Sequence, residues 1–251
     1  MVLDYSSASG PLDLTTAYVE LQRVLIQSPD TAKLLDRIAA LASDVTTPPS
    51  SCGITLIREG EVSTVAYSSR LAMRADEVQY ATSQGPCLHS MRSGQVVHVV
   101  DLATDSRWPA YRLEAMALGV RGSVSIPLVV EGKPVGTLNI YTDTDREFSE
   151  TDIANVRAFA DQASASLTLV FRHSEQMALE EQLRNALSTR AVIDQALGII
   201  MAQQRCNSTE AFAVLRKASQ DRNVKVAVIA SELILKVTGH PPQPPRPFTQ
   251  R

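Results

Sequence analysis

The chain opens with two stretches in which apolar residues recur every three or four positions. The first covers residues 14–26, and its spacing predicts an amphipathic helix. A second helix is predicted to begin after Asp30, because this side chain can cap a helix and Pro29 interrupts the segment before it. The second helix is expected to end before Pro48.

Strand-like patterns follow the two helices. Residues 52–57 and 62–67 are β-rich runs separated by Glu-Gly, and residues 123–130 and 135–141 form a second pair of the same kind. A short turn between two such runs predicts a hairpin. The elements expected between the two hairpins are a short helix at 87–93 and a strand at 96–100.

The second half of the chain has a helical pattern. A long helix is predicted to open near residue 149, where Ser149 and Asp152 are spaced as a capping box. Beyond Phe171, apolar residues continue at alternating steps of four and three, interrupted only by Arg190. The members of this seam are Leu179, Leu183, Ala186, Ile193, Leu197 and Ile200. Such a seam is typical of a coiled coil and equally of the packed face of a helix bundle, so both interpretations stay open.

Two shorter helices complete the pattern. The first is predicted to begin after a cap at 207–210, and the second covers about 224–237, after a turn at 222–223. The residues of this region expected to be in the core include Met201, Ala211, Phe212, Leu215 and Ala218.

The order of these elements divides the chain into four parts. Helices, hairpins and a final helix are typical of an α+β domain rather than of repeated βαβ units, and no glycine-rich phosphate loop is present. The expected parts are a flexible N-terminus at 1–13, an α+β domain at 14–172, a linker helix with a small all-α domain at 173–240, and a disordered proline-rich tail at 241–251.

The net charge and its distribution limit the kinds of partner that this protein is expected to bind. The net charge is −3, whereas a protein that bound nucleic acid over its whole surface would be basic. From Gln182 to His240, however, eight basic residues stand against four acidic ones. This imbalance favours a local patch that faces RNA or DNA, although an ordinary solvated helix surface can have the same charge.

Cysteine spacing and hydropathy indicate neither a metal site nor a membrane. The three cysteines lie far apart without a C-x-x-C spacing, so neither a disulfide framework nor a zinc site is expected. The first residues have no basic region followed by an apolar run, and no stretch approaches the ~20 apolar residues of a membrane span. We therefore expect a cytoplasmic protein.

One segment of the α+β domain has candidate sensor chemistry. Cys87 lies where the chain enters a short helix, and a thiol at a helix N-terminus can have a lowered pKa and be sensitive to oxidation, with His89 assisting. The same pair can contribute to a metal or haem site. The simpler interpretation is a buried Cys87 beside a surface His89, because free cysteines are commonly buried.

Residues 14–171 resemble a GAF domain. The resemblance is carried by the paired N-terminal helices, the hairpin after Cys52, the segment GQVVHVVDLATDSRWPAY, and the block from GVRGSVSIPL to FSETD. It implies a central antiparallel sheet flanked by helices, with a small-molecule ligand held over one face. The identity of that ligand, or of any cofactor, stays open.

The C-terminal part is similar to ANTAR domains, most specifically over RAVIDQALGIIM and STEAFAVLR. This resemblance implies a three-helix module that binds paired hairpin loops in nascent mRNA and prevents transcription termination. Joined to a GAF domain by a long helix, it implies a signal-responsive regulator rather than an enzyme. Many members have Lys after the alanine where this chain has Leu197, so a basic contact at this position is either missing or supplied by another residue.

The resemblance and the charge pattern together give the residues expected to contact RNA: Arg184, Arg190, Gln195, Gly198, Arg205, Arg216, Lys217, Arg222, Asn223 and Lys225. Arg190 can also pair with Asp194 one turn later. A helical glycine such as Gly198 costs ~1 kcal/mol relative to Ala, which is tolerable where a packed helix or an RNA loop approaches closely. We expect a homodimer through the linker helix, because two tethered modules on two loops gain effective concentration.

Two other functions are considered. A DNA-binding regulator is one alternative, since three helices can form a helix-turn-helix, but the first helix here is too long for that motif. A GAF-type methionine sulfoxide reductase is the other. It needs an accessible thiolate and a resolving cysteine, and the segments of Cys52 and Cys87 do not resemble the arrangement in that subfamily.

Overall fold

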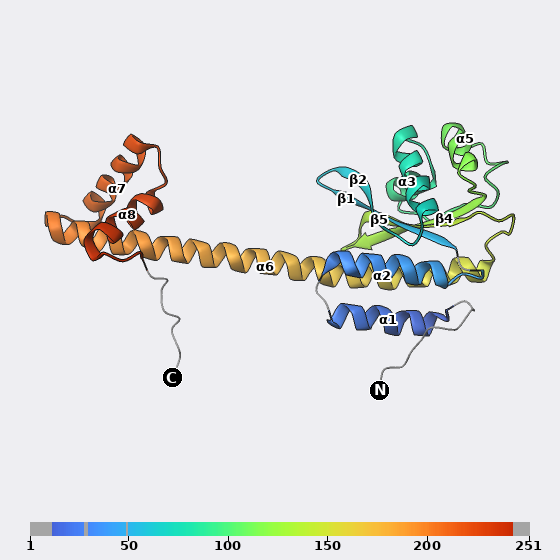
Figure 1. The fold of residues 1–251 in the computed structure, drawn as a ribbon, viewed down its shortest axis with the longest axis horizontal. Helices are drawn as coiled ribbons and strands as arrows, with labels where there is room; N and C mark the ends of the chain where they lie inside the picture. Colours follow the sequence, from blue (N-terminus) through green and yellow to red (C-terminus); the bar gives the residue numbers. More distant parts are fainter. Residues whose placement is uncertain (1–11, 28–29, 49, 243–251) are drawn as a thin grey trace. The chain divides into compact units, whose positions relative to one another are not determined.

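The computed structural model describes residues 12–27, 30–48 and 50–242, and the chain divides into two compact units, Met1–Arg172 and His173–Arg251 (Figure 1). Helix α6 (Glu150–Gln204) supplies residues to both units. The predicted flexible N-terminus and proline-rich tail fall mostly outside the described ranges. No helix within these ranges combines the length and the apolar character that crossing a membrane requires.

Five antiparallel strands form the sheet of the first unit, in the order β2-β1-β5-β4-β3. The strands are β1 (Ser51–Arg58), β2 (Glu61–Tyr67), β3 (Val97–Val99), β4 (Gly122–Val130) and β5 (Lys133–Thr142). Pairs β1–β2 and β4–β5 are the two predicted hairpins, and both residues of each Glu-Gly turn have a positive φ. Such turns match the twist of the strands that they join. The sheet confirms the predicted α+β class.

Apolar side chains cover one face of this sheet. Ile54 and Ile126 both lie opposite Leu138 on β5, and all three are buried. Helix α2 (Thr31–Asp44) and the first part of α6 cover this face, and α1 (Leu14–Gln27) packs on these two helices from the outside and completes the core (Figure 1). Both N-terminal helices confirm the sequence prediction, and Asp30 caps α2 by accepting from the N–H of Ala32 at 3.0 Å.

Three shorter helices cover the opposite face: α3 (Arg70–Thr82), α4 (Pro86–Ser93) and α5 (Pro109–Ala117). The sequence pattern predicts α4 but neither α3 nor α5. The buried positions of α3 are Ala72, Ala75, Asp76 and Gln79. Because these side chains are small or polar, α3 lacks the apolar stripe on which a periodicity prediction depends.

The predicted capping box opens α6. The backbone N–H of Ser149 donates to Asp152 Oδ2 at 3.0 Å, and the N–H of Asp152 donates to Ser149 Oγ at 3.1 Å. Each side chain thus satisfies a backbone donor that the first helical turn leaves without a helical partner.

The second unit contains the end of α6 with α7 (Ser208–Arg222) and α8 (Val226–Thr238). Its buried core consists of Ala196, Ile200, Ala211, Leu215, Ile229, Ala230 and Ile234. Asn207 and Glu210 form a reciprocal capping box at the start of α7, which confirms the predicted cap. Two predicted core residues are wrong: Met201 and Phe212 are 37% and 41% exposed. Smaller aliphatic residues fill the core, so these longer side chains lie outside it.

Candidate nucleic-acid interface and buried polar cluster

One face of α6 in the second unit points away from the core. Residues 190, 194, 198 and 201 recur every three or four positions, and all four are exposed. Gly198 lies about 160° around the helix from both Ala196 and Ile200, which are buried. The structure therefore brings Arg190 and Gly198 onto one solvent-facing surface, which we call the outer face of α6. Gln195 borders this face, and Arg184 lies about four turns before Gly198, about 40° from it around the helix.

Arg190 is held only weakly by its neighbour. Its Nε lies 3.8 Å from Oδ2 of Asp194, and the two side chains are 81% and 63% exposed. Ion pairs at such exposed positions contribute at most about 1 kcal/mol. The guanidinium can therefore exchange this carboxylate for a phosphate at little cost.

Gly198 leaves a stretch of helix backbone uncovered. A Cβ placed on this glycine would meet no atom within 4 Å in the described part of the chain. The sequence analysis offered two reasons for this glycine, a packed helix or an RNA loop. Packing against a helix of the same chain is therefore wrong. The remaining interpretation is close approach by a partner from outside.

The other predicted contact residues are spread over α7 and the turns. Arg205 follows the last residue of α6 with φ +51°, and Arg216 and Lys217 are exposed on α7. Arg222 donates from both of its Nη atoms to the two carboxylate oxygens of Glu232, which raises the pKa of Arg222 and occupies the guanidinium. Two other predicted contact residues lie at helix ends: Asn223 is the left-handed C-cap of α7, and Lys225 directly precedes α8.

Exposed guanidinium, ammonium and amide groups suit an RNA partner. Arg and Lys bind phosphates, whereas Arg and Gln can also hydrogen-bond the edges of unpaired bases. Bare backbone at Gly198 allows a loop to lie close to the helix. The outer face thus offers contacts for both the backbone and the bases of a nucleic-acid loop.

The first unit contains a buried polar cluster that the sequence analysis missed. Asp76 on α3 has no exposed surface and accepts from Thr64 Oγ1 at 3.1 Å, from Asn139 Nδ2 at 2.9 Å, and from the hydroxyl of Tyr141. Among the described residues, no basic side chain pairs with it. Burial raises the pKa of Asp76 to about 7, although these hydrogen bonds oppose the rise. Polar residues at alternate positions of β5 are the signal that could have revealed this cluster.

Gln79 links this cluster to the start of α4. Its Nε2 donates to the hydroxyl of Tyr141 at 2.8 Å, and its Oε1 accepts from the backbone N–H of Cys87 at 2.8 Å. Two glycines leave space for these side chains. A Cβ on Gly53 would lie 2.3 Å from Asp76 Oδ2, and one on Gly85 would lie 2.2 Å from Gln79 Oε1.

Cys87 does not have the lowered pKa expected of a thiol at a helix N-terminus. The side chain has no exposed surface, and its Sγ lies 2.9 Å from Thr137 Oγ1. Burial, followed by the negative charge of Asp76, raises the pKa of Cys87 to about 12. His89 is exposed, and its ring meets the edge of Trp108 at 5.8 Å between centroids. No group of three or more His, Cys, Asp or Glu side chains in the described ranges could hold a metal ion.

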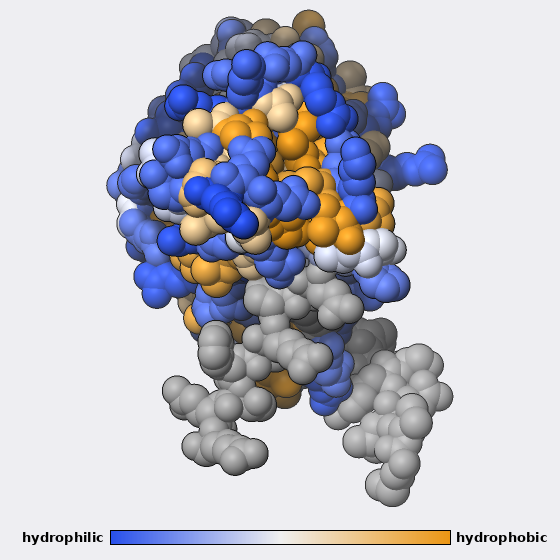
Figure 2. Space-filling view, turned by 90° about the vertical axis from the view of Figure 1, so that its left-hand side faces the viewer, coloured by the Kyte–Doolittle hydropathy of each residue, from blue (hydrophilic) through white to orange (hydrophobic). Residues whose placement is uncertain are grey.

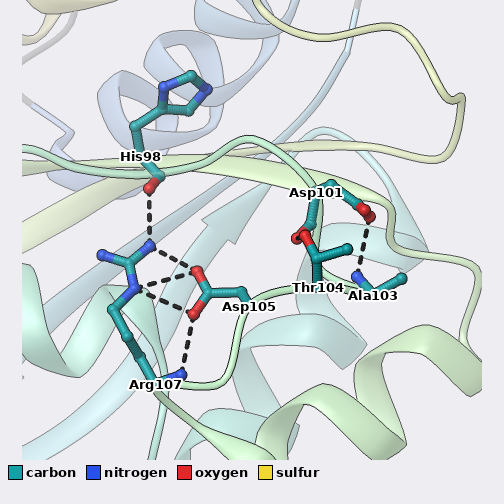
Figure 3. Close-up of polar contacts among 6 residues, drawn as sticks. All are labelled: His98, Asp101, Ala103, Thr104, Asp105 and Arg107. Carbon is teal, nitrogen blue, oxygen red and sulfur yellow. Dashed lines mark hydrogen bonds and ion pairs between the residues drawn. The ribbon is translucent and has the colours of Figure 1, made fainter.

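The segment between β3 and α5 is fixed by Arg107 (Figure 3). Its Nη2 donates to the carbonyl of His98 at 2.8 Å, and its Nε donates to Asp105 at 3.0 and 3.1 Å. These hydrogen bonds lower the pKa of Asp105. The guanidinium lies 4.4 Å from the ring centroid of Trp108, directly before α5. These contacts of Arg107 anchor the start of α5, which helps to cover the polar cluster.

A hollow beside α3 could hold a small ligand. It measures about 550 Å³ and is lined by Tyr67, Arg70, Leu71, Met73, Arg74 and Leu118. Two guanidinium groups beside a tyrosine ring and apolar side chains are chemically suited to an anionic organic molecule.

Comparisons with known proteins agree with this division into two units. The sequence matches the family model of the GAF domain over residues 28–168 and that of the ANTAR domain over residues 181–234. No curated protein matches the chain. A phycoerythrobilin-bound GAF domain from a cyanobacterial phytochrome is similar in structure, with 16% identity, a TM-score of 0.53, and coverage of 65% of this chain and 98% of that chain.

A second solved structure has the same fold. The free methionine-R-sulfoxide reductase from Neisseria meningitidis, in complex with its substrate, is 17% identical, with a TM-score of 0.51, and the match covers 69% of this chain and 98% of that chain. At these identities the two likenesses establish the fold of the first unit alone.

Proposed function

Because the chain belongs to the GAF domain family and has an ANTAR domain after its GAF domain, we propose that it is a signal-responsive regulator that binds tandem hairpin loops in nascent mRNA and prevents transcription termination. An ANTAR domain implies RNA-binding antitermination regulation. The hairpin target, the dimer and control by a ligand are the parts that we add.

The outer face of α6 is the observation that carries the proposal. Arg190 and Gly198 lie on the side of the helix away from the core, Gly198 leaves backbone uncovered, and Arg205 is exposed directly after the helix. The excess of basic residues from Gln182 to His240, within a chain of net charge −3, supports RNA binding by this domain in particular.

Antitermination follows from competition between two RNA structures. A protein that binds hairpin loops stabilises the hairpins, by mass action, against any other fold of the same nucleotides. Where a terminator shares nucleotides with the second hairpin, the bound protein excludes the terminator. The polymerase then continues.

A second copy of the chain is proposed to pair through α6. Leu179 and Leu183 belong to the stripe of alternating four- and three-residue steps on α6, and they are 56% and 55% exposed. Such a stripe on a long helix is typical of a coiled-coil seam. Two ANTAR domains in one dimer would meet two loops of one RNA, so the second contact gains effective concentration and strengthens binding without any new type of contact.

Control by the GAF domain is proposed to act through α6. Phe159 and Leu167 of this helix lie in the core of the GAF domain, whereas Ala196 and Ile200 lie in that of the ANTAR domain. A ligand that binds one arrangement of the GAF core better than another would bias the same helix from which the RNA contacts project.

The cysteines do not favour an enzymatic role. Cys52 and Cys87 are both fully buried, and burial raises the pKa of each thiol. Catalysis by a thiol requires an accessible thiolate. We therefore do not propose methionine sulfoxide reduction for this chain.

Binding of the full-length protein to a two-hairpin RNA, a one-hairpin RNA and a duplex of equal length tests the proposal. We expect the tightest binding to the two-hairpin RNA, with affinity lost when loop bases are changed. Arg190→Ala should weaken binding and reduce the salt dependence, whereas Arg157→Ala, an exposed arginine of the same helix in the GAF domain, should not. Equal binding to all three RNAs would reject the proposal, and tighter binding to duplex DNA would support the DNA-binding alternative.

A further inference from the structure

Phe212 is an aromatic side chain that the ANTAR core leaves outside. It is 41% exposed and is not among the residues that pack against the aliphatic core of the domain. From residue 173 to residue 242 the sequence has no other Phe, Trp or Tyr. Over these residues the one large aromatic side chain of the domain is thus partly open to solvent, where a partner from outside can reach it.

Phe212 lies beside a basic residue on α7. Arg216 follows it by one helical turn, so the two exposed side chains lie on the same flank of the helix. Ala211 and Leu215, each one position earlier, are buried in the core and fix the orientation of this flank. An aromatic face can stack on a nucleic-acid base, while a neighbouring guanidinium binds the phosphate beside it.

The charge of the domain favours a nucleic acid over an apolar partner. Apolar and hydrophilic residues lie side by side on the surface of the second unit (Figure 2). Basic residues outnumber acidic ones by eight to four from Gln182 to His240. A surface that combines a ring with positive charge is complementary to an unpaired, negatively charged nucleotide.

We propose that Phe212 stacks on an unpaired base of the bound hairpin loop, with Arg216 on the adjoining phosphate. Helix α7 then provides a base contact in addition to the contacts that the outer face of α6 offers. This inference rests on the proposed RNA-binding function. Stacking accepts any base in principle, so the ring sets affinity for a splayed-out loop rather than for one sequence.

The test uses the full-length protein and a two-hairpin RNA in which 2-aminopurine replaces one loop base at a time. Fluorescence of this base falls when it stacks, so the signal reports the contact itself. Phe212→Leu keeps an apolar side chain but removes the ring, and Phe212→Tyr keeps the ring. Val214→Ala is the matched control, because Val214 is 40% exposed on the other flank of the same helix.

We expect the wild type to quench one loop position strongly. Phe212→Leu should lose this quenching at saturating protein and bind about five- to a hundredfold more weakly, the range typical of a lost base–aromatic stack. Phe212→Tyr should remain within about threefold of the wild type, and Val214→Ala should be unchanged. Reading the fluorescence at saturation separates a lost stack from a partly unfolded variant.

Unchanged quenching and affinity in Phe212→Leu would overturn the inference and leave the RNA-binding proposal intact. A change of oligomeric state in Phe212→Leu, without a change in quenching, would also overturn it and place a second copy of the chain over the ring. If the wild type shows no preference for hairpin RNA over duplex RNA, the proposed function itself fails, and the inference fails with it.

Discussion

Arg190 and Asp194 lie one turn apart on the outer face of α6, with Nε and Oδ2 separated by 3.8 Å. The acid is the nearest charged neighbour that the structure assigns to this arginine among the described residues. In a domain proposed to bind RNA, the two side chains should act in opposite directions, because the first attracts phosphates and the second repels them.

Substitutions at these two positions are therefore expected to have opposite effects on RNA binding. Arg190→Ala should weaken binding to the two-hairpin RNA by about tenfold and lower the slope of log K against log salt by about one unit. Asp194→Asn should leave binding unchanged or strengthen it by a few-fold. Titrations across a salt series measure both effects, and weaker binding by Asp194→Asn would argue that the pair is needed intact.

Gly198→Ala should separate stability from RNA binding. Alanine at an exposed helix position is more favourable than glycine by about 1 kcal/mol, and the added Cβ meets no neighbour. We expect a higher unfolding temperature of the ANTAR domain together with weaker RNA binding, since the methyl group occupies space that the loop approaches. Circular dichroism and the RNA titration measure the two effects. Higher stability with unchanged binding would exclude contact at this glycine.

The sequence pattern predicted the elements with a clear apolar periodicity and missed the helices α3 and α5, which lack it. Both hairpins and helices α1, α2 and α6 follow from apolar periodicity or turn residues. Helix α3 was missed because it buries Asp76 and Gln79, which resemble a solvated surface in the sequence. The polar cluster joins Asp76 to Asn139, residues far apart in the chain, and nothing local indicates such a contact.

The apolar pattern of the sequence also could not predict which individual side chains are exposed to solvent. Phe212 was expected in the core because it lies next to Ala211 in a helical repeat, yet a shift of one position turns a side chain by about 100°. The outer face of α6, in contrast, could be anticipated in part from Arg190 and Gly198, which interrupt the apolar pattern.

Ionisation of Asp76 should make the GAF domain less stable as the pH rises. The pKa of this carboxyl is about 7 in the folded chain and 3.8 without the fold. Between these values the folded state keeps a proton that the unfolded state has lost, so stability falls from about pH 4 to pH 7 and is then level. The slope from one proton is at most about 1.4 kcal/mol per pH unit.

Asp76→Asn should remove this slope. The free energy of unfolding of the variant, minus that of the wild type, should increase between pH 4 and pH 7. Unfolding in urea can be followed by the fluorescence of Trp108, the one tryptophan of the chain. Asp161→Asn, at an exposed position, is the control. A difference that does not change with pH would show that Asp76 is ionised in the folded state throughout this range.

The leucine stripe on α6 should hold the dimer. Leu179→Glu with Leu183→Glu places like charges on the seam, so sedimentation is expected to change from dimer to monomer. Affinity for the two-hairpin RNA should fall by at least about tenfold towards that for one hairpin, and one-hairpin binding should not change. Met177→Glu, exposed on the same helix but off the stripe, is the control. A wild type that is monomeric would contradict the proposed dimer.

Single-round transcription measures the central claim most directly. The template encodes two hairpins, the second of which shares nucleotides with a terminator, and the readout is the fraction of transcripts that pass the terminator. The account predicts that the full-length protein, under conditions in which it binds the RNA, raises this fraction, and that Arg190→Ala does so much less. Read-through that stays constant while the RNA is bound would contradict antitermination and leave an RNA-binding protein with another role.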